Sequence, residues 1–97
     1  MINRTNLTSS MTETVEKWEH EIERLEEDMD KVEEKVKEDY REKIEDLKEQ
    51  KNALQEEIDT IDEVNDSGIE EIGESFKVAK DAFKESMKDI KNFFTKN

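Results

Sequence analysis

The 97-residue chain contains no cysteine and no proline, and it has only two glycines. Without cysteine there can be no disulfide, no thiol nucleophile and no cysteine-ligated zinc site. Hydrophobic residues make up 31% of the chain and aromatic residues only 6%. No apolar run reaches the roughly 20 residues that a membrane-spanning helix needs. The N-terminal residues also lack the apolar segment of a secretory signal, so we expect a cytoplasmic protein.

The common signatures of catalysis and cofactor binding are absent as well. There is no glycine-rich phosphate loop, no zinc-ligand spacing and no pairing of a nucleophile with a base. The single histidine, His20, shares a helical face with Glu16 and Glu23, but Lys17 occupies the position where a di-iron bundle would have glutamate. We therefore expect no enzyme, and we predict no catalytic residues, no bound cofactor and no metal site.

Charge is abundant, and its sign is unevenly spread. Charged residues make up 46% of the sequence, and the net charge is −13. Residues 1–73 hold 10 basic and 25 acidic residues, a net charge of −15, whereas residues 74–97 hold 6 lysines and 4 acidic residues, a net charge of +2. Because the acidic part would repel phosphates, nucleic acid is not an expected partner.

The apolar residues follow a coiled-coil pattern, with steps of three and four over roughly seven heptads. The pattern predicts one long coiled-coil helix over residues 10–64, after a disordered polar tail at residues 1–9. Ser10 and Glu13 have the spacing of a capping box at its start. The first half of this seam should form contacts between chains, through Val15, Trp18, Ile22, Leu25, Met29, Val32 and Val36.

The seam changes its rhythm in the second half. Two successive steps of four separate Val36, Tyr40 and Ile44, which makes an 11-residue unit and locally unwinds a left-handed supercoil. Lys51 then stands at an apolar-type position, where its stem would pack while its ammonium group reaches water. We expect this half of the long helix to pack within the chain.

Residues 65–68, Asn-Asp-Ser-Gly, form the one strong break. Ser67 and Glu70 repeat the capping-box spacing, and the short connection predicts an antiparallel turn into a second helix over residues 69–96. That helix is amphipathic and carries an 11-residue repeat, with an apolar arc formed by Ile72, Phe76, Ala79, Phe83, Met87, Ile90 and Phe94. Lysines follow one flank of the arc: Lys77, Lys80, Lys84, Lys88 and Lys91.

Two interpretations of this second helix stay open. Its apolar arc can be the inner face of a hairpin or bundle, with the lysines turned toward the acidic first helix. It can instead lie on an anionic membrane surface, as amphipathic helices with flanking lysines do. The repeat-equivalent Ser75 and Ser86 lie at the edge of the arc, where they would allow close approach of another helix.

Two motifs of the first helix share one spacing: Trp18-x-x-x-Ile22-x-x-Leu25 and Tyr40-x-x-x-Ile44-x-x-Leu47. Together with the C-terminal repeats they resemble a family of short bacterial proteins, described as coiled-coil-domain-containing proteins of unknown function. The resemblance covers about residues 14–96, and it implies a small soluble helical protein with a link to stress and no catalytic residues. Family members have Trp and Ala in the C-terminal repeats, where this chain has Phe76, Phe83 and Phe94.

The sequence thus predicts an all-α fold in which a long helix and a shorter antiparallel helix form an unequal helical hairpin. We expect it to assemble as a coiled-coil homo-oligomer, with an antiparallel dimer as the simplest form. The predicted function is that of a non-enzymatic, self-associating scaffold or adaptor, whose exposed acidic faces would dock another protein. The alternative is a peripheral protein that binds an anionic membrane surface through residues 69–96.

Overall fold

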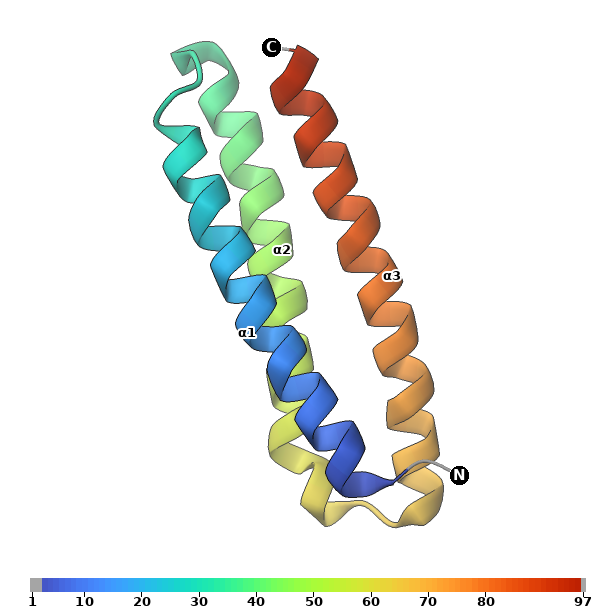
Figure 1. Cartoon of the computed structure of the whole chain (residues 1–97). Helices are drawn as coiled ribbons and strands as arrows, with labels where there is room; N and C mark the ends of the chain where they lie inside the picture. The colour runs from blue at the N-terminus through green and yellow to red at the C-terminus, as the bar shows by residue number, and fades with distance from the viewer. Residues whose placement is uncertain (1–2, 97) are drawn as a thin grey trace.

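A computed structural model describes residues 3–96, with side chains described for residues 3–93. The described chain is all-helical: α1 (Arg4–Met29), α2 (Glu34–Thr60), a 3-10 turn η1 (Ile61–Glu63) and α3 (Asp66–Lys96). The three long helices run up, down and up in an elongated bundle (Figure 1), which measures 49 Å by 17 Å by 16 Å. The predicted all-α class is confirmed.

The structure does not contain the predicted continuous helix over residues 10–64, because residues 30–33 leave the helix and α2 turns back along α1. The amides of residues 30–32 close short turns onto the carbonyls of residues 27–29. Neither Gly nor Pro marks this break, but Asp30 and Val32 are poor helix formers. Folding back also lets one chain cover both sides of its apolar seam, which a projecting helix cannot do. Three helices therefore replace the two arms of the unequal hairpin.

The first helix begins earlier than predicted. α1 starts at Arg4 and not at Ser10, so residues 4–9 are helical where a polar tail was expected. Asn3 is the N-cap, and its side-chain oxygen accepts a hydrogen bond of 3.2 Å from the amide of Asn6. Leu7 is buried in the core and extends the apolar face of α1 by one turn. Because Leu7 gains burial against the other helices, α1 extends back to the cap at Asn3.

The chain turns near residue 65, as predicted, but the helix boundaries differ by a few residues. α3 begins at Asp66, and Asn65 is the residue that caps it in place of Ser67. The Asn65 side-chain oxygen accepts a hydrogen bond of 2.9 Å from the amide of Gly68. A Cβ atom on Gly68 would lie only 2.9 Å from the Cβ of Val64, so glycine permits the close approach of the turn to the first turn of α3.

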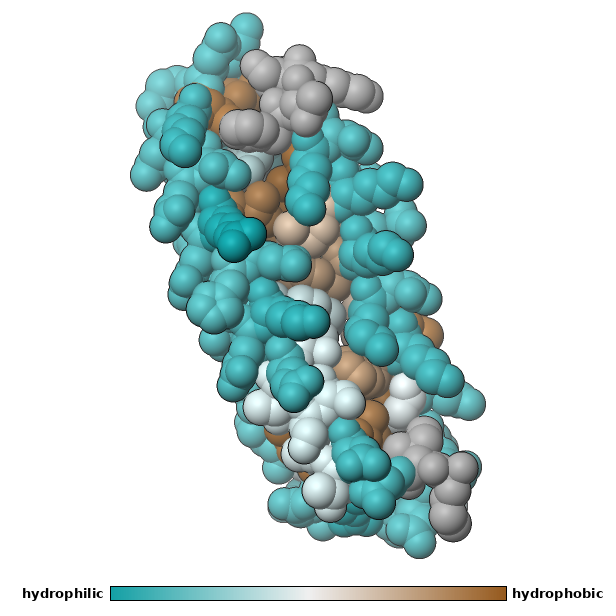
Figure 2. All heavy atoms as spheres, viewed as in Figure 1, coloured by the Kyte–Doolittle hydropathy of each residue, from teal (hydrophilic) through white to brown (hydrophobic). Residues whose placement is uncertain are grey.

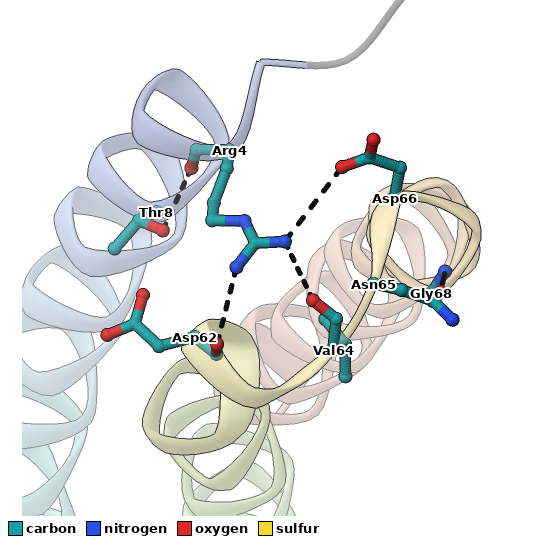
Figure 3. A network of polar contacts seen from close by, with 7 residues as sticks. All are labelled: Arg4, Thr8, Asp62, Val64, Asn65, Asp66 and Gly68. Atoms are coloured by element: carbon teal, nitrogen blue, oxygen red, sulfur yellow. Dashed lines mark hydrogen bonds and ion pairs between the residues drawn. The ribbon is translucent and has the colours of Figure 1, made fainter.

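Arg4 fastens the start of α1 to this turn (Figure 3). Its guanidinium group donates to the carbonyl oxygens of Asp62, at 3.3 Å, and Val64, at 2.7 Å. It also lies 4.0 Å from the carboxylate of Asp66. The carbonyls at a helix end lack partners within the helix, so Arg4 supplies donors that the end of η1 needs.

The core is a single seam along which the three helices meet. No charged side chain is buried in it within the described part of the chain. Its contacts follow the three-and-four spacing of each helix, so the sequence pattern identified the inward faces correctly. The buried residues are Leu7, Met11, Val15, Trp18, Ile22, Leu25, Tyr40, Ile44, Leu47, Leu54, Ile61, Ile69, Phe76, Phe83, Met87 and Ile90.

Candidate binding groove

The residues that were expected to join separate chains lie inside one chain. Four of them are buried: Val15, Trp18, Ile22 and Leu25. The other three are half-buried near the α1–α2 loop: Met29, Val32 and Val36. Because α2 supplies the second helix of this seam, a second copy is not needed to cover it. The structure of one chain does not test the expected self-association, but the seam on which that expectation was based is covered within the chain.

The apolar arc of α3 also faces the bundle. Its buried residues are Phe76, Phe83, Met87 and Ile90. Ile72 and Ala79 are half-buried and pack against the same core, whereas the side chain of Phe94 lies outside the described residues. The arc is therefore the inner face of a bundle, and a membrane could reach it only if α3 separated from the other helices.

The two repeat-equivalent serines connect α3 to α2. Ser75 donates a hydrogen bond of 3.1 Å to Glu57, and Ser86 accepts one of 3.1 Å from the side-chain amide of Gln50. The serines stand 11 residues apart on α3, and their partners stand 7 apart on α2. One edge of the apolar arc is thus fixed against α2, while the opposite edge faces α1.

A groove runs between α1 and α3 along that opposite edge. It consists of a larger hollow of about 580 Å³ and a smaller one of about 430 Å³, which share Glu21, Met87 and Lys91. Figure 2 shows an apolar strip on this side of the molecule between two hydrophilic flanks. We call the two hollows together the α1–α3 groove. Its floor contains Trp18, Leu25, Tyr40, Phe83 and Met87.

An aromatic stack forms the centre of the floor. The rings of Trp18 from α1 and Phe83 from α3 have centroids 4.1 Å apart and planes inclined by 4°. Both residues are buried, and no other ring pair with that close spacing is found among the described residues. Stacked aromatic pairs add about 0.5–1.5 kcal/mol beyond their burial, so this contact helps to hold α1 at a fixed distance from α3.

The rim of the groove is mostly basic. The larger hollow is lined by five lysines and one glutamate, whereas the smaller one has two basic and two acidic residues. The five lysines are Lys17, Lys80, Lys84, Lys88 and Lys91. The charged residues that line the smaller hollow are Arg24 and Lys91 with Glu21 and Asp28. The groove is therefore strongly positive at one end and balanced at the other.

Three rim lysines form no short ion pair with a carboxylate among the described residues. Within the described residues, Lys17, Lys84 and Lys88 take part in no ion pair of 4.0 Å or shorter. A fourth, Lys80, lies 4.6 Å from the centre of the Phe76 ring, a cation–π contact. Lys84 and Lys88 line the same hollow as Glu21 of α1, but within the described residues neither forms an ion pair with it.

Lysines on the α1–α2 side behave differently. Lys48 lies 3.1 Å from Glu26, and Lys51 lies 3.8 Å from Glu19, so both connect α2 to α1. The hydrogen bond that Lys48 donates to Glu26 is the main cause that raises the pKa of Lys48. Lys51 is half-buried with its ammonium group at the surface, as its apolar-type position predicted. Lys43 and Lys77 do not line the groove and also form no such ion pair within the described residues, so what distinguishes the groove is that it brings three of these lysines together.

Tyr40 forms part of the floor of the smaller hollow. Burial raises the pKa of its phenol, and the nearby negative charge of Asp28 raises the pKa further. Its ring lies 6.4 Å from that of Phe93, at an angle of 43°. The phenol therefore remains neutral at physiological pH, and the charged groups of this hollow are Glu21, Arg24, Asp28 and Lys91.

Nothing in the described residues forms a metal centre. His20 lies on the outer surface, with Nδ1 3.9 Å from Glu23. Among the described residues, no three His, Asp or Glu side chains come together in a group that could hold a metal ion. Within the same residues, no helix is both long and apolar enough to cross a membrane.

The sequence identified the α3 side of the groove and missed the α1 side. Lys17, Glu21, Arg24 and Asp28 line the groove only because α1 folds back to become a neighbour of α3. A continuous long helix would have carried these residues away from α3, so no local signal in the sequence connects them with the groove.

Comparison of the chain with protein-family models, with curated proteins and with solved structures gave no match. The resemblance to short bacterial coiled-coil proteins therefore stays a prediction, and the function has to be argued from the groove.

Proposed function

We propose that this protein is a non-enzymatic interaction module, an adaptor that binds another protein in the α1–α3 groove. The observation that carries the proposal is the rim of lysines without acidic partners. The chain has 29 acidic residues and a net charge of −13, yet within the described residues Lys17, Lys84 and Lys88 form no ion pair of 4.0 Å or shorter beside an apolar floor. An apolar strip with a charged rim is the usual anatomy of a protein-binding surface.

The proposal changes the surface that was expected to bind a partner. The sequence suggested docking on the acidic faces of a long helix. In the bundle those faces carry ion pairs such as Arg41 with Glu38, and they lack large apolar side chains. Exposed ion pairs contribute little binding energy, whereas groups that become desolvated in a groove contribute more. The basic groove is therefore the better candidate surface.

Binding to an anionic lipid surface is the second candidate, and the row of lysines beside the apolar arc of α3 favours it. That function needs α3 to leave the bundle, because Phe76 and Ile90 of the same arc are buried and do not line the groove. Each large apolar side chain that becomes exposed costs about 1.5–3 kcal/mol, unless lipid covers it at once. The groove of the closed bundle requires no such opening, so we place it first.

Site-specific photo-crosslinking in the cells of origin tests the proposal. A photoreactive residue at position 14, on the wall of the groove, should form a crosslink to a second polypeptide. The same residue at position 42, on an exposed face of α2, should not. The double variant K84E/K88E should lower the crosslinking yield from position 14.

The matched control for charge is K35E/R41E, which alters two exposed basic residues outside the groove and changes the net charge equally. Circular dichroism should show that both double variants remain helical. Equal crosslinking from positions 14 and 42, no crosslink from position 14, or an equal loss in the two double variants would each refute a binding function of the groove.

A further inference from the structure

We propose that the α1–α3 groove binds an acidic amphipathic helix of the partner protein, and that this helix lies antiparallel to α1 and α3. The inference rests on the proposed function and specifies its partner. It assigns the apolar face of the partner helix to the groove floor, and its acidic residues to the lysines on both rims. The bound helix would complete a four-helix arrangement.

A second copy of this chain does not suit the groove. Two grooves placed face to face would bring the lysine rims together, and like charges in an interface are costly. The outer faces of a copy are acidic, but they offer almost nothing to the floor. Val78, with 68% of its surface exposed, is the only exposed large hydrophobic side chain among the described residues, and it lies on α3 itself. The occupant must therefore be a different chain.

The length of the groove indicates a helix of about four turns. On α1 the lining residues run from Thr14 to Asp28, which corresponds to about 21 Å at 1.5 Å per residue. On α3 they run from Lys80 to Asn92, or about 18 Å. A helix of about 14 residues has this length. A small compact anion would use only a fraction of it.

The chemistry of the two rims defines the face that the partner presents. Lys17 lies on the α1 rim, and Lys84 and Lys88 lie on the α3 rim, so basic groups stand on both sides of the apolar floor. A helix that fits has apolar residues at positions i, i+3 or i+4, and i+7, with Glu or Asp on both flanks of that stripe. This is the pattern of an acidic amphipathic helix.

The charge gradient along the groove sets the direction of the helix. The larger hollow, with five lysines, lies toward the start of α1, and the smaller hollow, with Asp28, lies toward its end. A helix carries partial positive charge at its N-terminus and partial negative charge at its C-terminus. An antiparallel partner would place its C-terminal carbonyls near Lys17 and Lys80 and its N-terminus near Asp28. Its dipole would also oppose those of α1 and α3, which is favourable.

The test uses the full chain and synthetic 18-residue peptides without Trp, of which about 14 residues fill the groove. The first peptide carries a Leu stripe flanked by Glu, the second has the same composition in scrambled order, and the third has Lys in place of Glu. Trp18 is the only tryptophan of the chain and lies in the floor, so its fluorescence reports binding directly. We expect saturable binding of the first peptide and at least about tenfold weaker binding of the other two.

The charge variants localise the site. K84E/K88E should weaken binding of the acidic peptide by about tenfold or more and reduce its dependence on salt, because screened lysine contacts are lost. The control K35E/R41E should change the affinity by less than about twofold, because both residues are exposed and neither lines the groove. Binding that is the same for the scrambled peptide, or the same in both variants, would overturn the proposal.

A separate measurement determines the direction in which the peptide helix lies in the groove. A spin label on the N-terminus of the acidic peptide should broaden the NMR signals of residues around Asp28, and a label on its C-terminus those around Lys17. The reverse pattern would refute the antiparallel direction. In a last experiment, vesicles with and without anionic lipid are added to the protein. If anionic lipid changes the fluorescence of Trp18 and the acidic peptide does not bind, the ligand of this protein is a membrane surface and the proposal of a helical partner is wrong.

The outcomes separate this inference from the function on which it rests. Crosslinks from position 14 without binding of the acidic helix would retain the interaction module and refute the helical partner. Binding of the acidic helix in solution without crosslinks in cells would establish the chemistry of the groove and refute the adaptor function.

Discussion

Tyr40 and Trp18 are the only tyrosine and the only tryptophan of the chain, and each lies in one hollow of the α1–α3 groove. Absorbance of tyrosinate therefore reports the smaller hollow alone, and indole fluorescence the larger one. The two signals allow single residues to be followed in the unlabelled protein.

Tyr40 should titrate at higher pH in the folded protein than in the unfolded chain. Burial is the larger cause that raises its pKa above the ordinary value of 10.0, and the charge of Asp28 is the smaller cause. A spectrophotometric titration with and without denaturant measures the difference. The variant D28N should remove only part of the shift, because burial remains. A midpoint equal to that of the unfolded chain would refute the buried environment.

The same shift predicts how stability depends on pH. The folded state holds the Tyr40 proton more tightly than the unfolded chain does. The contribution of Tyr40 to the unfolding free energy is therefore complete below the pKa that Tyr40 has in the unfolded chain. It is lost as the pH rises through the pKa that Tyr40 has in the folded protein. Lys48, whose pKa is raised chiefly by its hydrogen bond with Glu26, acts in the same direction. The unfolding free energy should therefore decline above about pH 10, and the variant Y40F should decline less steeply.

Individual residues also show where sequence reasoning succeeds. The spacing of apolar residues correctly identified Ile44, Leu47 and Leu54 as inward-facing, because one face of a helix must be buried whatever its neighbour is. The spacing of apolar residues does not show which of two candidate N-cap residues begins a helix. Asn3 and Ser10 both suit an N-cap, and burial of Leu7 decides between them.

At the scale of the helix, the N-cap of α3 allows a prediction about the unfolding free energy. N65A should lower the unfolding free energy by about 1 kcal/mol, because the amide of Gly68 loses its acceptor. N65D retains an acceptor oxygen and should cost less. S67A should be nearly neutral, because Ser67 is exposed and does not cap the helix. Urea unfolding followed by circular dichroism measures all three, and an equal loss in S67A and N65A would contradict the assignment.

The loop between α1 and α2 is the element that the sequence did not predict. Residues 30–33 contain neither Gly nor Pro, and the apolar spacing continues through them without interruption. A helix and a turn are both compatible with such a segment locally. The choice depends on the burial gained when α1 and α2 pack together, and that gain is a property of the whole chain. The α1 side of the groove was missed for the same reason.

For the whole molecule, we expect a monomer at micromolar concentration, because the seam that was expected to join chains is covered within the bundle. The net charge of −13 opposes association as well. Sedimentation equilibrium at low and at high salt tests this expectation, since salt would screen the repulsion and leave only apolar contacts. A dimer that forms at either salt concentration would contradict it and would restore self-association.

The odd number of helices has a mechanical consequence. The start of α1 and the end of α3 lie at opposite ends of the bundle (Figure 1). A pulling force applied through these two points acts along the long axis, so the helix interfaces are loaded in shear over their length. A two- or four-helix bundle with both ends on one side would instead be unzipped one turn at a time. Tension along the long axis would therefore load all turns of these helix interfaces together.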